Sequence, residues 1–262
     1  MNPAAPTRTA RFGETEDTVV VEEPLEIRVE GQPTAVTMRM PGDDLDLAIG
    51  FLTTEGVIGP DDPMSDVRAI AQVTENVVDV RLADGVSPSR ARSADRTLFA
   101  SSSCGICGKA SIDRILRGRP RAALGPTAPP PEPQLEPTDA LLTALAAAFD
   151  AAQVYTHSTG CVHAAALFDA TGSVVLLRED VGRHNAVDKV LGAHIRADRA
   201  FDGLGLVVTS RAGFEVVQKA VTVGIGLVCT LGAPTSLAID VAAEADCTLV
   251  GWLRPGRWRR FT

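Results

Sequence analysis

The sequence predicts a layered α/β domain with a mixed sheet, together with a smaller β-rich subdomain on its N-terminal side. Two observations predict this fold class. In the second half of the chain, short apolar runs alternate with segments whose apolar residues recur at helical spacing, as in folds with partly parallel strands. In the first half, apolar and polar residues alternate with a period of two, which is typical of half-buried strands.

The N-terminal half begins with a polar segment, residues 1–17, that we expect to be a flexible tail. Turn residues around Gly31 separate two alternating runs and predict a hairpin. Asp43 or Asp44 is expected to cap a helix that ends near Gly56. The strands expected in this half are residues 25–30, 35–40, 67–73, 77–82 and 97–100.

A proline-rich segment at residues 126–137 has Pro at six of its twelve positions, so it predicts a semi-rigid connector. It separates an N-terminal subdomain, residues 18–125, from an α/β subdomain, residues 138–262. Thr138 is expected to cap the first helix of the second subdomain. The further elements expected there are strands at 164–168, 173–177, 204–209, 226–231 and 247–253, and helices at 185–193, 214–223 and 236–243.

The composition excludes several classes of protein. The 262-residue chain carries 25 Lys and Arg against 33 Asp and Glu, a formal net charge of −8, which excludes general binding to nucleic acid. No apolar run of about 18 residues supports a membrane span, and the polar N-terminus argues against a secretory signal. Five cysteines without a signal predict reduced thiols in the cytoplasm. Cys229 and Cys247 lie in apolar runs and are interpreted as small buried hydrophobic residues.

The most specific feature is the Ser- and Gly-rich segment 101–108, in which two residues separate Cys104 from Cys107. A structural zinc site would need a second ligand pair at finger spacing, which is missing. A thioredoxin-type redox pair would need a strand-to-helix context. The third interpretation is a nucleophilic or sulfur-carrying thiolate. Charge favours it, because residues 88–121 contain eight basic and two acidic side chains, and cations stabilise a thiolate and attract anionic molecules.

Two other segments combine polar side chains without matching a metal pattern. His157, Cys161 and His163 lie within seven residues, but their spacing fits no zinc site, and a polar loop is the simplest interpretation. Residues 251–260 contain four Arg and both Trp of the chain without an acid. Trp beside Arg suits stacking on a base or a pterin while pairing phosphates, and a frayed basic terminus is the alternative.

Two strand-to-helix junctions are candidates for a ligand site. Arg183, His184 and Lys189 follow one expected strand, and Ser210 and Arg211 follow another. α/β proteins bind ligands at such junctions, and amide groups at a helix N-terminus favour phosphate. Helix capping explains Ser210 well, but it does not explain Arg183, His184 and Arg211 together.

Taken together, four motifs resemble the formate dehydrogenase accessory sulfurtransferase family, FdhD. They are Cys104-Gly-Ile-Cys107-Gly, Thr159–His163, Glu179–Lys189 and Ser210–Lys219. The resemblance runs from the first hairpin to the C-terminus and leaves out residues 1–17 and the proline-rich connector. It implies a cytoplasmic, homodimeric protein whose fold is similar to that of cytidine deaminase.

The resemblance implies a sulfurtransferase that receives persulfide sulfur from a cysteine desulfurase. The sulfur would pass to molybdenum bis(molybdopterin guanine dinucleotide) before this cofactor enters formate dehydrogenase. Cys104 is the implied persulfide bearer and Cys107 its helper. The implied cofactor-binding stretch is Trp252, Leu253, Arg254, Pro255, Gly256 and Arg257, and the additional pocket candidates are Arg183, His184, Lys189, Ser210 and Arg211.

The sequence departs from zinc deaminases, which use H-x-E and a later P-C-x-x-C. Here Ala165 stands where the Glu would be, and the CxxC precedes His163 and follows Ser103. No structural metal is therefore expected. A non-catalytic chaperone that binds and docks the cofactor stays open as an alternative, as does a thiol or zinc enzyme on the same fold. The sequence does not rank the roles of Cys104 and Cys107.

Overall fold

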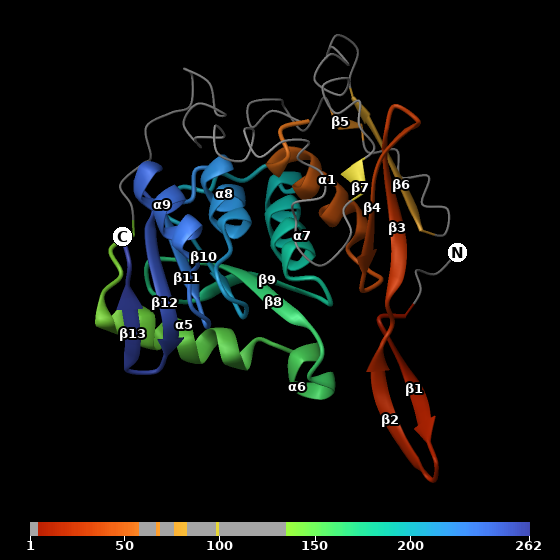
Figure 1. The fold of residues 1–262 in the computed structure, drawn as a ribbon, viewed down its shortest axis with the longest axis horizontal. Helices are drawn as coiled ribbons and strands as arrows, with labels where there is room; N and C mark the ends of the chain where they lie inside the picture. Colours follow the sequence, from red (N-terminus) through yellow and green to blue (C-terminus); the bar gives the residue numbers. More distant parts are fainter. Residues whose placement is uncertain (1–4, 58–66, 69–75, 83–97, 100–134) are drawn as a thin grey trace. The chain divides into compact units, whose positions relative to one another are not determined.

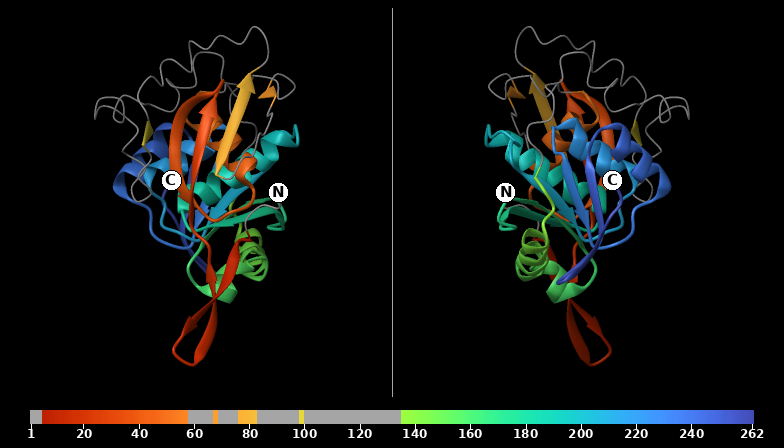
Figure 2. Two further views of the ribbon diagram at one scale, coloured as in Figure 1. Left: turned by 90° about the vertical axis from the view of Figure 1, so that its right-hand side faces the viewer. Right: turned by 90° about the vertical axis from the view of Figure 1, so that its left-hand side faces the viewer.

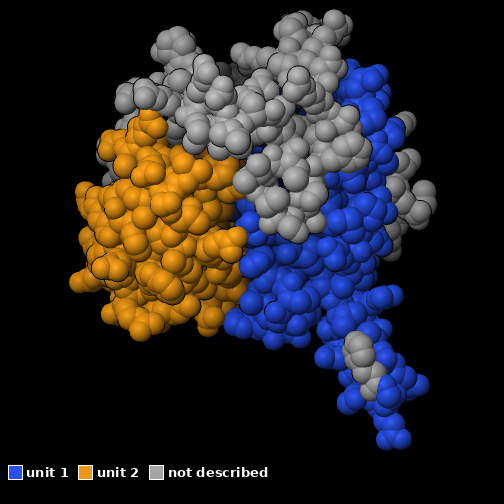
Figure 3. Space-filling view, in the orientation of Figure 1, with its two compact units in different colours: residues 1–108, 154–163, 179–198 blue, residues 109–153, 164–178, 199–262 orange. Residues whose placement is uncertain are grey.

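Strands dominate the first half of the chain, and strands alternate with helices in the second half (Figure 1). The computed structural model describes residues 5–57, 67–68, 76–82, 98–99 and 135–262. The chain divides into two compact units, shown in Figure 3: unit 1 comprises residues 1–108, 154–163 and 179–198, and unit 2 the rest. This division differs from the sequential one expected, because α6 (Tyr155–Thr159) and α7 (Arg183–Arg196) belong to unit 1.

The strands of unit 1 form a five-stranded sheet in the order β5-β6-β3-β4-β7. Their bounds are Glu23–Val29 for β3, Gln32–Arg39 for β4, Val67–Arg68 for β5, Val77–Leu82 for β6 and Leu98–Phe99 for β7. The antiparallel β3–β4 hairpin confirms the prediction. Its turn has positive φ at Glu30 and Gly31, a conformation that a tight hairpin turn requires.

Helices α1 (Asp44–Thr54) and α7 pack directly against each other in unit 1. Gly50 and Gly192 allow this close approach. A Cβ at Gly50 would overlap the carbonyl oxygen of Asp188, and a Cβ at Gly192 would overlap that of Asp46. The two helix backbones therefore meet where neither helix carries a side chain, and the apolar side of α1 joins the core of unit 1 with Leu47, Ile49 and Leu52.

A two-stranded sheet replaces most of the tail expected at residues 1–17. β1 (Thr7–Phe12) and β2 (Thr15–Val20) form an antiparallel hairpin that is drawn in red in Figure 2. Thr9 pairs with Thr18, and Arg11 forms an exposed ion pair with Glu16 at 3.0 Å. The expectation of a flexible tail is wrong for these residues, since cross-strand pairs of Thr and of opposite charges stabilise a hairpin without an apolar face.

Unit 2 is built on a six-stranded mixed sheet in the order β13-β12-β11-β10-β8-β9. Its strands are β8 (His163–Phe168), β9 (Val174–Asp180), β10 (Gly205–Val208), β11 (Leu227–Thr230), β12 (Thr248–Arg254) and β13 (Arg257–Arg260). The central strands β10, β11 and β12 run parallel to one another, and β8 and β13 are antiparallel to their neighbours. The first residue of β8 and the last two residues of β9 belong to unit 1. The predicted mixed α/β class is confirmed.

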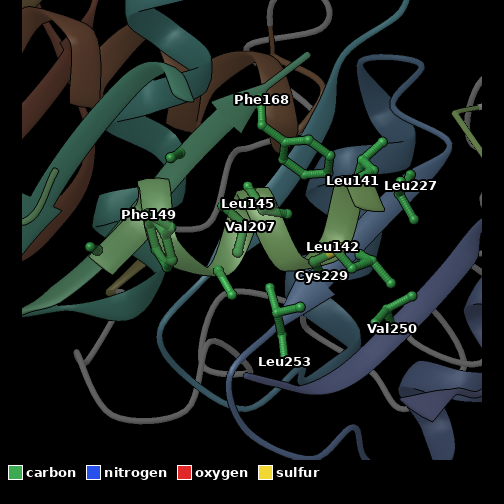
Figure 4. Close-up of a cluster of buried hydrophobic side chains, with 13 residues drawn as sticks. Leu141, Leu142, Leu145, Phe149, Phe168, Val207, Leu227, Cys229, Val250 and Leu253 are labelled. Carbon is green, nitrogen blue, oxygen red and sulfur yellow. The ribbon is translucent and has the colours of Figure 1, made fainter. Parts of the chain in front are cut away.

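The core of unit 2 lies between this sheet and α5 (Asp139–Ala151), as Figure 4 shows. Leu142, Leu145 and Phe149 of α5 meet Phe168 of β8 and Val250 of β12, all fully buried. The side chain of Thr138 accepts a hydrogen bond from the backbone of Leu141 at 3.2 Å, so the predicted cap is confirmed.

Helices α8 (Phe214–Thr222) and α9 (Ser236–Glu244) connect the parallel strands, as the sequence predicts. The two helices also pack against each other. Besides the β1–β2 hairpin, the sequence does not predict the five-residue α6 or strand β13. In the described part of the chain, no helix combines the length and the apolarity needed to cross a membrane.

Replacing Gly192 with Ala should lower the free energy of unfolding by about 1–3 kcal/mol, because the new methyl group overpacks the contact between α1 and α7. The better helix propensity of Ala, about 1 kcal/mol, works in the opposite direction. Urea unfolding measures the difference. Ala193→Ser is the matched control one residue away and should change stability by less than about 0.5 kcal/mol. A Gly192→Ala protein as stable as its parent would contradict the packing argument.

Candidate functional site

The candidate site residues that the structure describes fall into two groups, one in each unit. The first group is Arg183, His184 and Lys189, on α7 of unit 1. The second group, in unit 2, is Ser210, Arg211, Trp252, Leu253, Arg254, Pro255, Gly256 and Arg257. Cys104 and Cys107 lie outside the described residues, so the prediction that they carry the chemistry stays a prediction.

Asp180 ends β9 and is fully buried, and its carboxylate accepts four hydrogen bonds. Oδ1 accepts from the backbone N–H of Gly182 at 2.8 Å and from Nδ2 of Asn185 at 3.0 Å. Oδ2 accepts from the backbone N–H of Met40 at 3.0 Å and from Nζ of Lys189 at 2.8 Å. Because burying a carboxylate is costly unless its oxygen atoms are paired, these contacts fix the turn between β9 and α7 against the end of β4.

Lys189 and Asn185 lie four residues apart and therefore face the same side of α7. Lys189 has no exposed surface, and its Nζ also donates to the carbonyl oxygen of Met40 at 2.8 Å. Asn185 donates to the carbonyl of Met38 at 2.7 Å and accepts from Thr37 Oγ1 at 3.2 Å. Lys189 is expected from the sequence in the cofactor pocket, but its ammonium group is bound to internal partners, so Lys189 stabilises unit 1 instead.

Glu179, the residue before Asp180, holds the short helix α6. Its Oε2 accepts from the backbone N–H groups of Val154 and Tyr155, each at 2.9 Å, and its Oε1 accepts from the backbone of Thr156 at 2.7 Å. The hydroxyl of Thr156 adds a fourth hydrogen bond at 2.8 Å. The donors include the first backbone groups of α6, which have no partner within the helix. Local sequence does not predict α6, because its cap comes from a residue more than twenty positions away.

Arg183 and His184 are the first two residues of α7 and are half-buried. They follow Gly182, which is extended and contributes no side-chain cap. The first amide groups of a helix lack intrahelical partners and carry the positive end of its dipole. A cationic side chain at this position therefore adds to a local potential that favours an anion.

His163 lies at the start of β8, on the same unit as Arg183. Burial lowers the pKa of His163 most, the positive charge of Arg183 lowers it further, and Asp180 raises it. The imidazole is therefore neutral at physiological pH and can donate or accept a hydrogen bond. Nearby in sequence, Cys161 is exposed, with its Sγ at 3.5 Å from Thr159 Oγ1.

In unit 2, the segments after the parallel strands β10 and β11 are joined by backbone hydrogen bonds. Leu231 donates to Val208 at 3.0 Å, and Gly232 donates to the carbonyl of Ser210 at 3.2 Å. Ser210 is buried and its Oγ bonds the carbonyl oxygen of Arg211 at 2.9 Å, whereas Arg211 itself is exposed. The two candidate residues thus lie at the carboxyl edge of parallel strands, as the sequence analysis expects.

Trp252 projects from β12 beside this edge. It is 48% exposed although both of its neighbours, Gly251 and Leu253, are buried. Its φ of 57° lies in the left-handed region, which bulky residues rarely adopt, and the pairing with β13 shifts register at this point. The backbone N–H of Trp252 donates to the carbonyl of Gly232 at 3.0 Å. Leu253 faces the core, so its expected contact with a cofactor does not fit its placement.

The four remaining residues of the predicted stretch form the end of the β12–β13 hairpin. Arg254 is exposed, and its Nη1 donates to the carbonyl oxygens of Leu231 at 2.9 Å and Leu253 at 2.6 Å. Pro255 and Gly256 form the turn, and Arg257 is exposed. β13 is an ordered strand, so the alternative of a frayed terminus from Arg257 onward is wrong. The indole of Trp258 anchors the strand by donating to Asp139 at 3.0 Å.

We call the exposed residues Arg211, Trp252 and Arg257, together with the half-buried Gly232, the Trp252 surface. It combines an exposed aromatic ring with exposed cations at the carboxyl edge of the sheet. A ring of this kind can stack on a planar heterocycle, and Arg can pair with phosphate oxygens. Within the described parts of the chain, no three His, Cys, Asp or Glu side chains gather as metal ligands would.

The two buried cysteines of unit 2 fit the interpretation given from sequence. Burial raises the pKa of Cys247 to about 12 and raises the pKa of Cys229 further still. Both side chains are therefore thiols and not thiolates at physiological pH, and the thiolate is the nucleophile in sulfur chemistry. Cys229 packs among the core residues of Figure 4.

Comparisons with known proteins agree with the motifs. The model of the FdhD/NarQ family matches residues 20–262. The sulfur carrier protein FdhD of Streptomyces avermitilis is 47% identical over 245 residues, which are 91% of this chain and 84% of the relative. The sulfur carrier protein FdhD of Mycobacterium tuberculosis is 42% identical over 256 residues, or 94% of this chain and 90% of the relative.

A crystal structure from Desulfotalea psychrophila, assigned as a formate dehydrogenase accessory protein, has a similar fold. The TM-score is 0.72 at 21% sequence identity, over 99% of this chain and 96% of the other. At this identity the similarity establishes the fold alone.

Lys189→Met should lower the free energy of unfolding by about 3–5 kcal/mol, because it leaves the carboxylate of Asp180 buried without its cation. Adding Asp180→Asn removes the unpaired charge and should recover part of the loss. Urea unfolding measures both variants. Arg81→Met is the control, since the exposed side chain of Arg81 pairs with Asp79 and Glu30 near the surface and its loss should cost less than about 1 kcal/mol. An equal cost for Lys189→Met and Arg81→Met would refute the role of the buried pair.

The imidazole of His163 should titrate below its ordinary value of 6.5, and Arg183→Gln should raise its pKa without restoring that value, since burial is the larger cause. The unfolded chain protonates His163 more readily than the folded chain does. The neutral imidazole therefore makes its full contribution to the free energy of unfolding above about pH 6.5, and this contribution is lost as the pH falls through the folded pKa. NMR titration of the imidazole proton signals measures both effects. Arg196→Gln, at the far end of α7, is the control and should leave the titration of His163 unchanged. A His163 pKa that does not change in Arg183→Gln would contradict the assigned cause.

Proposed function

The chain belongs to the FdhD/NarQ family, and we propose that it carries sulfur for formate dehydrogenase. In this proposal it accepts persulfide sulfur from a cysteine desulfurase and transfers it to molybdenum bis(molybdopterin guanine dinucleotide), its substrate. Relatives that are called sulfur carrier proteins match more than nine-tenths of the chain. The structural observation that carries the proposal is the Trp252 surface, which presents an aromatic ring and cations together.

Sulfur uptake begins at Cys104. Its thiolate attacks the outer sulfur of the desulfurase persulfide, a new bond forms between Cys104 and that sulfur, and the old sulfur–sulfur bond breaks with its electron pair staying on the desulfurase thiolate. The excess of basic over acidic residues in the segment 88–121 supports this role, because cations lower the pKa of a thiol.

Sulfur delivery involves Cys107 as the helper. Its thiolate attacks Sγ of Cys104, a disulfide forms between the two cysteines, and the outer sulfur leaves as sulfide, which becomes a ligand of the molybdenum. Two equivalents of a cellular thiol then reduce this disulfide in two exchange steps, leave as a disulfide of their own, and restore both cysteines. The two residues between Cys104 and Cys107 keep the thiols within reach of each other along the chain.

The Trp252 surface is our proposed site for a guanine dinucleotide part of the substrate. Trp252 would stack on a planar ring, and Arg211 and Arg257 would pair with phosphate oxygens. Ser210 and Arg254 contribute through the backbone groups that they bond. The start of α7, with Arg183 and His184, is the proposed anion site of unit 1. Lys189 is buried in unit 1 and Leu253 in unit 2, so neither is part of the proposed sites.

The mixed sheet and its helices support the finer expectation of a cytidine-deaminase-like fold in the α/β part of the chain. Ala165 lies fully buried on β8, two residues after His163, where a deaminase would need its catalytic Glu. This difference favours sulfur transfer over hydrolysis. A cytoplasmic homodimer that meets a desulfurase and a formate dehydrogenase completes the proposal.

Cys104→Ala should abolish sulfur uptake. After incubation with a cysteine desulfurase and cysteine, mass spectrometry of the parent protein should detect one added sulfur on the peptide that contains Cys104, since its thiolate is the nucleophile. The variant should lack the adduct and should fail to restore formate dehydrogenase activity in a strain without the accessory protein.

Cys161→Ala is the matched control for this experiment, because Cys161 is an exposed free thiol in the described part of the chain. It should retain both the adduct and the activity. A Cys104→Ala protein that still carries sulfur and still supports the dehydrogenase would overturn the assignment. Binding of the cofactor by a parent protein that takes up no sulfur would favour a chaperone instead.

A further inference from the structure

Trp252 is held in an unfavourable backbone conformation, and its surroundings must stabilise that conformation. Left-handed φ is unfavourable for a bulky residue and persists only where other contacts hold it. The N–H of Trp252 has one backbone partner, the carbonyl oxygen of Gly232. The position of this carbonyl therefore helps to hold the backbone from which the indole ring projects.

The carbonyl of Gly232 has a second donor. The hydroxyl of Thr230 donates to it at 2.8 Å, and Thr230 has no exposed surface. Thr230 is the last residue of β11, so this hydrogen bond connects the end of the strand to the residue two positions later. The carbonyl is thus fixed from the sheet by Thr230 and receives the N–H of Trp252 from β12.

Glycines make the surrounding approach possible. A Cβ at Gly232 would lie 2.9 Å from Cα of Arg211, and a Cβ at Gly251 would lie 3.0 Å from Cδ of Pro234 and 3.2 Å from the carbonyl oxygen of Gly232. The loop therefore has little room to shift sideways. The guanidinium of Arg254 bonds the carbonyl of Leu231 from the outer side, at 2.9 Å.

We propose that Thr230 is a positioning residue: its hydroxyl, acting through the carbonyl of Gly232, sets Trp252 as the platform for the heterocyclic ring of a nucleotide ligand. The proposal rests on the proposed function in one respect, namely that a nucleotide binds at Trp252. Thr230 itself, with no exposed surface, does not touch the ligand. Its contribution is to hold the aromatic ring in place before the ligand arrives, which lowers the cost of binding.

The sharpest test removes the hydroxyl without changing the size of the side chain. Thr230→Val does this, and Thr230→Ser keeps the hydroxyl as the matched control. Both are made in a Trp258→Phe parent, in which Trp252 is the only Trp of the chain. Fluorescence anisotropy and acrylamide quenching of Trp252 report its mobility without a ligand. Guanosine diphosphate and pyrophosphate serve as probes, because they share the phosphates but only the first has a ring.

In the Thr230→Val protein, the anisotropy of Trp252 should fall and its quenching by acrylamide should rise. The Kd for guanosine diphosphate should increase about five-fold, the value of one lost hydrogen bond, while the Kd for pyrophosphate should stay within about two-fold. Thr230→Ser should match the parent in all three measurements. Trp252→Ala should weaken guanosine diphosphate about ten-fold or more and leave pyrophosphate unchanged.

Equal weakening of both probes would mean a general loss of structure and would overturn the positioning role. Unchanged anisotropy and unchanged Kd in Thr230→Val would overturn it too. If Thr230→Val does not fold, Thr230→Ala removes the same hydroxyl from a smaller side chain. A parent that binds neither probe would refute the proposed nucleotide site, whereas the fluorescence comparison would still decide whether Thr230 holds Trp252.

Discussion

Two adjacent buried carboxylates, Glu179 and Asp180, are the constraint on which unit 1 depends. Each accepts four hydrogen bonds, and together they tie the end of β9 to the start of α6, to the end of β4 and to α7. A buried carboxylate without these donors would cost several kcal/mol. The chain must therefore bring segments that are about 140 residues apart in sequence to the same place, which explains why unit 1 is discontinuous.

The same constraint explains how one motif can serve both the fold and the site. In the segment from Glu179 to Lys189, the residues that face inward satisfy one another and the backbone, whereas Arg183 and His184 begin the helix at a half-buried position. The motif alone does not separate these two roles, because Lys and Arg are both plausible phosphate ligands. The separation depends on which face of α7 meets β4, and that is a property of the tertiary structure.

Local patterns predict unit 2 well and unit 1 less well, for a physical reason. The elements from β10 to β12 have apolar runs and turn residues that determine their structure locally, and the cap of α5 at Thr138 needs only its own neighbours. By contrast, α6 depends on a cap from Glu179, and the β1–β2 hairpin depends on cross-strand pairs between polar residues. The outward direction of Trp252 follows from one left-handed residue, which no periodicity predicts.

In unit 2, burial keeps Cys229 and Cys247 away from solvent. The burial of these cysteines matters for a sulfur carrier, because a persulfide reacts with any accessible thiolate. Burial removes Cys229 and Cys247 from that chemistry by raising their pKa, so sulfur exchange is confined to cysteines that water can reach. The carbonyl of Gly232 accepts hydrogen bonds from Thr230 and Trp252, and these fix the backbone beside the exposed ring that we propose as the platform for a ligand.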